Sequence, residues 1–199
     1  FDYLDYAMPQ QTTRAKLNQL LQKQILILDG ATGTMIQKYG FSESDFRGEQ
    51  FKDHSYDLKG CNDLLNMTQP EAIKSIHLAY LKAGANIIET NSFNATPVSL
   101  EHYGVANLTY ELNRLSVELA KQAISELSAE QQQIPRFVAG TMGPTPRSLL
   151  NPCDADNPAL RDVTWDELVE GYTEATRGLV DGGVDILMIE TILDPLNSK

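Results

Sequence analysis

Polar side chains that could bind a small charged ligand follow four short aliphatic runs of the chain, each at the point where the run ends. A carboxylate in such a place must be paired or face a solvated cavity, because burying an isolated charge is costly. Glu89 and Glu190 could therefore hold the ammonium group of a ligand, or they could form salt bridges with Arg136, Arg147 or a neighbouring lysine. The residues at the four run ends are Asp29, Glu89 with Asn91, Thr141, and Glu190 with Asp194.

The loop DGATGT at 29–34 combines two glycines with backbone N–H groups at the start of a short helix expected from Met35 to Tyr39. The amides at a helix N-terminus and the helix dipole favour a carboxylate or a phosphate. The loop matches neither the P-loop pattern nor GxGxxG. It could bind an anion, or Asp29 could simply cap the helix while the glycines form a tight turn, and the sequence leaves these two interpretations equal.

Other candidate ligands and metal-binding residues are sparse. Asn91 and Asn94 could orient a polar ligand or cap the helix that follows, and capping is expected for Asn94. The three histidines and two cysteines show no zinc-ligand spacing, so Cys61 and Cys153 are expected to be bystander thiols. His77 falls among apolar residues at helical spacing, which predicts a core histidine with its hydrogen bonds satisfied.

The aliphatic runs lie within the segments 25–34, 85–93, 136–145 and 184–195, and the stretches between them are long enough for helices. Continuous hydrophobicity is typical of strands buried on both faces, as in a parallel sheet. Helices are predicted at 68–84, where Thr68 could be the N-cap and Gly84 the end, at 107–127, and at 164–183. Thr164 and Glu167 have the spacing of a capping box.

Alternating strands and helices predict an α/β fold with parallel strands, either an open doubly wound sheet or a (β/α)8 TIM-type barrel. Polar residues at all four strand ends favour the barrel, which binds its ligands at the carboxyl ends of its strands. Four βα units are half of such a barrel. We therefore expect residues 1–24 to form an N-terminal helical extension and residues 25–199 to form the first half of a barrel. The exposed edges and apolar face of a half barrel predict self-association.

Composition and charge narrow the possible partners. The 199 residues carry a formal net charge of −11, which opposes binding to nucleic acid or to anionic lipid. The aliphatic runs are far shorter than the roughly 20 residues that span a bilayer. The first ten residues lack the pattern of a secretory signal. With two cysteines far apart in the sequence, a cytoplasmic location is expected.

Several longer motifs resemble the homocysteine S-methyltransferase family. They are LDGATGTMIQ (28–37), FRGEQFKDH (46–54), LKGCNDLLNMTQPEAI (58–73), AGANIIETNSFNAT (83–96), FVAGTMGPT (137–145) and DGGVDILMIETILD (181–194). Within that family, the FRGEQFKDH and TQPEAI stretches are most similar to the amino-terminal homocysteine-binding module of cobalamin-dependent methionine synthases. The resemblance extends from about residue 17 to residue 199.

The resemblance implies a (β/α)8 barrel that binds L-homocysteine at the carboxyl ends of its strands. Asp29 and Glu190 would receive the ammonium group of the substrate. Backbone amides near Gly30, Ala31 and Thr32 would hold its carboxylate. Asn91 matches a polar position after the second strand, and no catalytic residue is expected within this chain.

The resemblance also implies a zinc ion held by three cysteine thiolates, which would activate the substrate sulfur. This chain has no Cys-Cys pair, so the zinc ligands are expected after Lys199, and neither zinc nor cobalamin is expected to bind to this chain. The implied methyl donor is methylcobalamin, recharged by 5-methyltetrahydrofolate on other domains of the same polypeptide. This chain alone is then expected to be inactive. The alternatives are a cobalamin-free homocysteine S-methyltransferase and a noncatalytic binding or assembly module.

Overall fold

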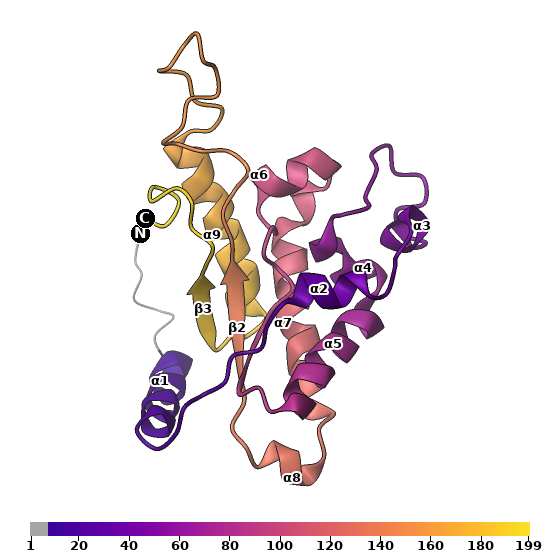
Figure 1. The fold of residues 1–199 in the computed structure, drawn as a ribbon, viewed down its shortest axis with the longest axis vertical. Helices are drawn as coiled ribbons and strands as arrows, with labels where there is room; N and C mark the ends of the chain where they lie inside the picture. Colours follow the sequence, from indigo (N-terminus) through magenta and orange to yellow (C-terminus); the bar gives the residue numbers. More distant parts are fainter. Residues whose placement is uncertain (1–7) are drawn as a thin grey trace.

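The computed structural model describes residues 8–199, and the part of the expected N-terminal extension at 1–7 lies outside them. Helix α1 spans Met8–Leu21 and is followed by a turn and an extended segment that leads to the sheet (Figure 1). Within the described residues, no helix is long and apolar enough to cross a membrane.

The centre of the fold is a parallel sheet with the strand order β1-β2-β3 (Figure 1). Strand β1 spans Ile87–Glu89, β2 spans Phe137–Met142 and β3 spans Ile186–Ile189. Helix α7, Thr109–Ser125, lies in the connection from β1 to β2, and α9, Trp165–Asp181, lies in the connection from β2 to β3. The prediction of an α/β fold with parallel strands is thus confirmed for these units.

The aliphatic run at 25–28, predicted to be a strand, forms a single parallel β-bridge between Leu28 and Ile87. Asn86 explains why the run still lies along the sheet edge. The backbone N–H of Asn86 donates to the carbonyl of Ile27 (2.7 Å), and its side-chain Oδ1 accepts the N–H of Ile27 (3.0 Å). The carbonyl of Asn86 accepts the N–H of Phe137, the first residue of β2 (2.9 Å). A side chain therefore replaces part of the backbone ladder at this edge.

Most helix boundaries follow the sequence signals. The capping box of Thr164 and Glu167 starts α9, and Gly84 ends α5, Pro70–Ala83, in the left-handed conformation (φ 111°). Thr68 differs from its prediction: it does not cap α5, because it belongs to the preceding α4, Leu65–Thr68, and its hydroxyl donates to the carbonyl of Leu64. The remaining helices are α2 Thr32–Gln37, α3 Glu43–Arg47, η1 Asn62–Leu64, α6 Pro97–Leu100, η2 Glu101–Tyr103, η3 Ala106–Leu108 and α8 Ala129–Gln132.

Helices α5, α7 and α9 pack side by side on one face of the sheet, with α7 between the other two. Glycine permits the closest approach, because a Cβ atom at Gly178 of α9 would collide with the carbonyl oxygen of Tyr110 in α7. Ile88 and Val138 of the sheet pack beneath this layer against Leu179. The helix layer holds the strands in place and leaves their carboxyl ends to carry the polar residues.

His77 lies on the buried face of α5 and is fully enclosed, as its helical spacing predicts. Its hydrogen bonds are not satisfied, however, because neither ring nitrogen has a partner among the described residues. The expectation of a satisfied core histidine is therefore wrong in this respect. Burial lowers the pKa of His77 to about 4, so the imidazole of the folded protein is uncharged at neutral pH.

We expect the substitution His77→Leu to make the protein less sensitive to acid. Because the pKa of His77 is lower in the folded state than in the unfolded chain, the wild-type protein loses stability as the pH falls from about 6.5 towards 4. Leucine has a similar volume and no titrating group. The difference in unfolding free energy between variant and wild type should grow by about 2 kcal/mol from about pH 7.5 to about pH 5.

Urea unfolding across this pH range measures the difference, with His102→Gln as a control at an exposed histidine. Parallel pH profiles for His77→Leu and wild type would contradict the role of the buried imidazole.

Candidate functional site

A cavity of about 420 Å³ lies at the carboxyl ends of the strands and contains most of the residues expected there. Gly30, Ala31, Thr32, Asn91 and Glu190 all line it. Asp29 does not line it and lies beside it, next to Glu89. The other lining residues are Gly33, Asn62, Asp63, Glu89, Thr90, Phe93, Asn94 and Thr141.

The carboxylate of Asp29 fixes the first loop to strand β1. Its two oxygens accept the backbone N–H of Glu89 at 3.0 and 3.1 Å. Asp29 does not cap α2, since that helix starts after Ala31, three residues earlier than expected, with no side-chain cap. Burial raises the pKa of Asp29 to about 7, and repulsion from Glu89 and Glu190 adds to the rise. The capping interpretation of Asp29 is therefore wrong.

Glu89 is the last residue of β1 and Glu190 directly follows β3, and neither forms a salt bridge within residues 8–199. The two arginines considered as partners are used elsewhere: Arg136 donates to the carbonyls of Gly84 and Ala85, and Arg147 pairs with Glu101. Burial and then the charge of Glu190 raise the pKa of Glu89 to about 7. The site thus holds carboxylates without a cationic partner in the described chain.

Thr191, directly after Glu190, has a left-handed backbone with φ 53°. For a β-branched residue this conformation costs about 1–3 kcal/mol and persists only where the surroundings impose it. The chain therefore turns sharply at the end of β3, immediately after the carboxylate that lines the cavity.

The first loop supplies backbone donors on another side of the cavity. The N–H groups of Gly30, Ala31 and Thr32 make no backbone hydrogen bond within the described residues, and the first helical bond of α2 comes from Met35. These amides are the groups for which the resemblance implies carboxylate binding. A ligand with one negative and one positive end therefore meets complementary groups here.

Asn91 lines the cavity, but its amide nitrogen is engaged in structural contacts. Its Nδ2 donates to the carbonyl of Asn62 (2.7 Å) and to Oδ1 of Asn66 (3.2 Å). Asn66 in turn donates to the carbonyl of Asn91 (2.7 Å). Asn94, for which capping was expected, does not cap, because Thr96 is the N-cap of α6. Asn91 therefore joins the end of β1 to η1 and α4.

Asp63 is a site residue that the sequence reasoning did not single out. It is 3% exposed, its Oδ1 accepts the N–H of Asn94 (2.9 Å), and burial raises its pKa to about 6. It also lines a second cavity of about 320 Å³ with Tyr103 and Thr145. The sequence carries little signal for it, because residues 61–65 read CNDLL and mix polar with apolar side chains.

Asp194 does not join the cavity. Its carboxylate accepts hydrogen bonds from the hydroxyl of Ser148 and from the N–H groups of Leu149, Leu150 and Leu196. These contacts lower its pKa against the opposing effect of burial. The residue therefore anchors the long loop after β2, which extends beyond the end of the sheet (Figure 1).

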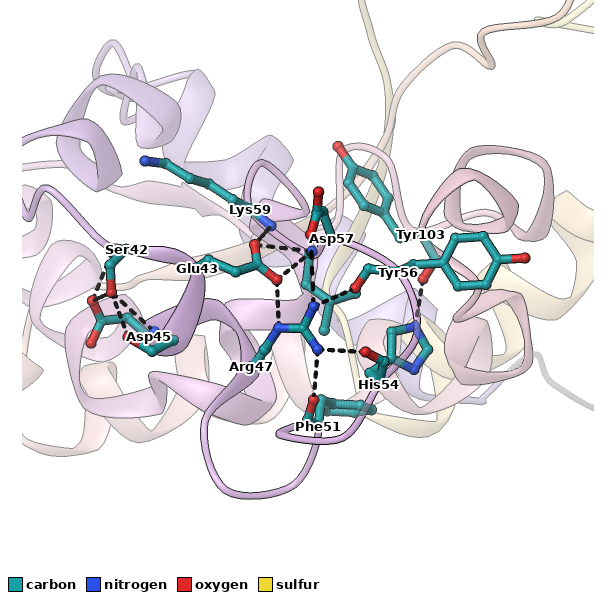
Figure 2. A network of polar contacts seen from close by, with 12 residues as sticks. Ser42, Glu43, Asp45, Arg47, Phe51, His54, Tyr56, Asp57, Lys59 and Tyr103 are labelled. Atoms are coloured by element: carbon teal, nitrogen blue, oxygen red, sulfur yellow. Dashed lines mark hydrogen bonds and ion pairs between the residues drawn. The ribbon is translucent and has the colours of Figure 1, made fainter.

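A cluster around Arg47, shown in Figure 2, holds the loop before Asn62 and Asp63. Both of these residues line the cavity. The guanidinium donates to the carbonyls of His54 (2.6 Å) and Tyr56 (2.8 Å), and its Nε pairs with Glu43 at 2.7 Å. Planar arginine suits several fixed acceptors at once.

The carboxylate of Glu43 completes this cluster from the other side. It accepts the N–H groups of Leu58 (2.9 Å) and Lys59 (2.7 Å), a few residues before Asn62. Burial opposes ionisation, yet these bonds and Arg47 lower the pKa of Glu43. The FRGEQFKDH motif thus has a positioning role in this structure.

The described residues do not fit the zinc site that the resemblance implies. Among them, no group of three His, Cys, Asp or Glu side chains could hold a metal ion. Cys61 is buried and Cys153 exposed. Burial, with the nearby charge of Asp63, raises the pKa of Cys61 to about 12, which disfavours the thiolate that zinc requires.

A parallel α/β sheet with a polar cavity at the carboxyl ends of its strands is typical of proteins that bind a small molecule there. Comparison with known families specifies the class: residues 26–199 match homocysteine S-methyltransferases. The chain belongs to the homocysteine S-methyltransferase family.

Solved structures agree with this assignment. The metallated form of the homocysteine methyltransferase MmuM from Escherichia coli is 26% identical with a TM-score of 0.67, and covers 91% of this chain. Its oxidized form is 27% identical, with the same TM-score and the same coverage of this chain. The present chain spans 59% and 58% of the chains in these two structures.

We expect Arg47→Ala to destabilise the protein by about 1–3 kcal/mol, because it leaves the part-buried carbonyls of Phe51 and His54, and the carboxylate of Glu43, without this donor. Arg47→Lys should lie between this variant and wild type, since lysine keeps the charge and loses the planar fork. Urea unfolding measures the effect. Lys52→Ala, an exposed position in the same loop, is the control and should differ from wild type by less than about 0.5 kcal/mol. Equal stability of Arg47→Ala and Lys52→Ala would rule out this role.

Proposed function

We propose that this chain binds L-homocysteine in the 420 Å³ cavity as part of an enzyme that methylates the homocysteine sulfur to form methionine. One observation carries the proposal: carboxylates without a salt-bridge partner and backbone amides without a backbone hydrogen bond line the same cavity. A zwitterionic amino acid matches both. Membership of the homocysteine S-methyltransferase family supports homocysteine as that amino acid.

In this proposal Asp29 and Glu190 receive the ammonium group, and the N–H groups near Gly30, Ala31 and Thr32 hold the carboxylate. Glu89 lines the cavity next to Asp29 and is the third acidic residue of the site. Asn91 keeps η1 and α4 in place around the ligand.

These residues contribute by positioning the substrate. In the reaction the homocysteine sulfur attacks the methyl group in line, so that a carbon–sulfur bond forms as the bond between methyl and donor breaks. Fixing both ends of the amino acid restricts the sulfur to one approach. In favourable cases such orientation lowers the activation barrier by about 7 kcal/mol. Because the described residues do not fit zinc, we derive no step through a metal.

The methyl donor separates two versions of the proposal. The FRGEQFKDH and TQPEAI motifs favour methylcobalamin, recharged by 5-methyltetrahydrofolate on other domains of the polypeptide. The similarity to E. coli MmuM, named only as a homocysteine methyltransferase, is compatible with a cobalamin-free enzyme. Turnover with methylcobalamin by the protein at its full natural length would favour the first version. A noncatalytic binding module remains the alternative if neither donor type supports turnover.

The wider architecture is part of the same proposal. Residues 1–24 would be an extension, and residues 25–199 the first four units of a (β/α)8 barrel, with zinc ligands outside the described residues and this chain inactive by itself. Strand β3 pairs with β2 and lies at the edge of the sheet, and its Leu187 and Ile189 are exposed. An exposed apolar edge strand supports self-association. A cytoplasmic location belongs to this proposal as well.

Substituting the carboxylates should weaken homocysteine binding. We expect Asp29→Asn and Glu190→Gln each to raise the Kd by roughly 10- to 100-fold, because each removes a charge-assisted hydrogen bond to the ammonium. Isothermal titration calorimetry on the protein at its full natural length measures this. Glu170→Gln on the exposed side of α9 is the control and should leave the Kd unchanged. Unaltered affinity in either variant would refute the ammonium assignment for that residue.

Homocysteine binding should weaken at low pH. The pKa values of Asp29 and Glu89 are raised to about 7, and an ammonium ligand favours their ionised forms, so binding must displace protons below that pH. We expect the Kd to rise roughly 10-fold from about pH 8 to about pH 6, with proton release measurable by calorimetry in two buffers. Glu89→Gln should show a smaller change, because one titrating group and its repulsion are gone. A Kd independent of pH would count against carboxylate recognition.

A further inference from the structure

Three polar side chains share one face of the sheet at its carboxyl end, and a threonine stands between two glutamates. Glu89 of β1 is in register with Ala139 of β2, and Thr141 follows two residues later. Thr141 is in register with Met188 of β3, and Glu190 follows two residues later. Because side chains alternate along a strand, Glu89, Thr141 and Glu190 point to the same side. All three line the 420 Å³ cavity.

The backbone of Thr141 is held firmly by its neighbours. Its N–H donates to the hydroxyl of Thr90 (3.0 Å), and its carbonyl accepts the hydroxyl of Ser92 (2.9 Å). The Thr90 and Ser92 hydroxyls also bond to each other at 2.7 Å. These contacts fix the position of the Thr141 side chain relative to the two glutamates.

The hydroxyl of Thr141 is the exception in this network. The residue is 2% exposed, yet its Oγ1 has no hydrogen-bond partner among the described residues. Buried hydroxyls are rarely left unpaired, because their desolvation is then not compensated. A fixed, unpaired hydroxyl in a cavity wall indicates that its partner is a ligand.

We propose that the Thr141 hydroxyl accepts a hydrogen bond from the ammonium group of the bound amino acid. An ammonium has three N–H donors, and the carboxylates of the site take the other two. A neutral acceptor serves the third donor without adding to the repulsion among Asp29, Glu89 and Glu190. Thr141 is then a positioning residue that distinguishes an amino acid from a thiol that lacks the amino group. This inference rests on the proposed function.

The test compares two ligands on two variants of the protein at its full natural length. Thr141→Val removes the hydroxyl and keeps the shape, whereas Thr141→Ser keeps the hydroxyl. The ligands are L-homocysteine and 4-sulfanylbutanoate, which is homocysteine without its amino group. We expect Thr141→Val to raise the Kd of homocysteine roughly 5- to 30-fold and that of 4-sulfanylbutanoate less than about 2-fold. Thr141→Ser should bind homocysteine within about 3-fold of wild type.

Equal weakening of both ligands by Thr141→Val would overturn the proposal and assign the hydroxyl to the carboxylate or the sulfur. No weakening of either ligand would overturn it too. Failure of the wild-type protein to bind homocysteine would reject the proposed function itself, a result distinct from both. Thermal unfolding verifies that each variant folds, and Thr141→Ala replaces Thr141→Val if the valine does not fit.

Discussion

Mutual repulsion among partly buried carboxylates is the constraint on which this site depends. Burial and the charges of Glu89 and Glu190 raise the pKa of Asp29, burial and the charge of Glu190 raise that of Glu89, and no cation from the described chain neutralises these groups. Because the folded-state pKa values of Asp29 and Glu89 are raised to about 7, these groups lower the stability of the fold progressively as the pH rises from about 4 to about 7, and the full cost is present above about pH 7. The fold therefore carries an energetic cost that a cationic group in the cavity relieves. Such cost is common where a protein must bind charge tightly.

The rest of the structure holds these carboxylates close together despite their repulsion. The helix layer of α5, α7 and α9 fixes the strands from one side. The Arg47 and Glu43 cluster, shown in Figure 2, fixes the loop that leads to Asn62 and Asp63. Asn91, which lines the cavity, ties that region to the end of β1. Their joint effect is a preformed pocket, in which binding does not require the loops to be ordered first.

Local sequence patterns predicted the strands at 87–89, 137–142 and 186–189, because short aliphatic runs between amphipathic helices have few other structures available. They also predicted that Glu190, Asn91 and the 30–32 loop would meet, since the ends of parallel strands lie at one edge. Pairing partners could not be predicted in the same way. That Asn91 would bond to Asn66, or that His77 would have no partner, depends on tertiary distances.

The same limit applies to Asp63 and to the first aliphatic run. Asp63 lies among polar and apolar neighbours in CNDLL at 61–65, and only the fold shows that it faces two cavities. The run at 25–28 has the composition of a strand, and its place at the sheet edge reduces its pairing to a bridge. Secondary structure at an edge depends on a neighbour, which the run itself does not encode.

The hydrogen bonds of Asn86 also help to position Asp29, a residue to which Asn86 does not bond. A strand joined by a full ladder has its alignment fixed by many bonds, whereas the segment before Asp29 is aligned by a few: two between Asn86 and Ile27, and two backbone bonds that Ile87 forms with Ile27 and with Asp29. A slip of one residue along a sheet edge moves every side chain to the opposite face. It would carry the Asp29 carboxylate away from the N–H of Glu89 and separate the charges of the site. The register of this edge, and with it the spacing of negative charge around the cavity, thus depends on a small number of bonds, one of which the Asn86 side chain makes.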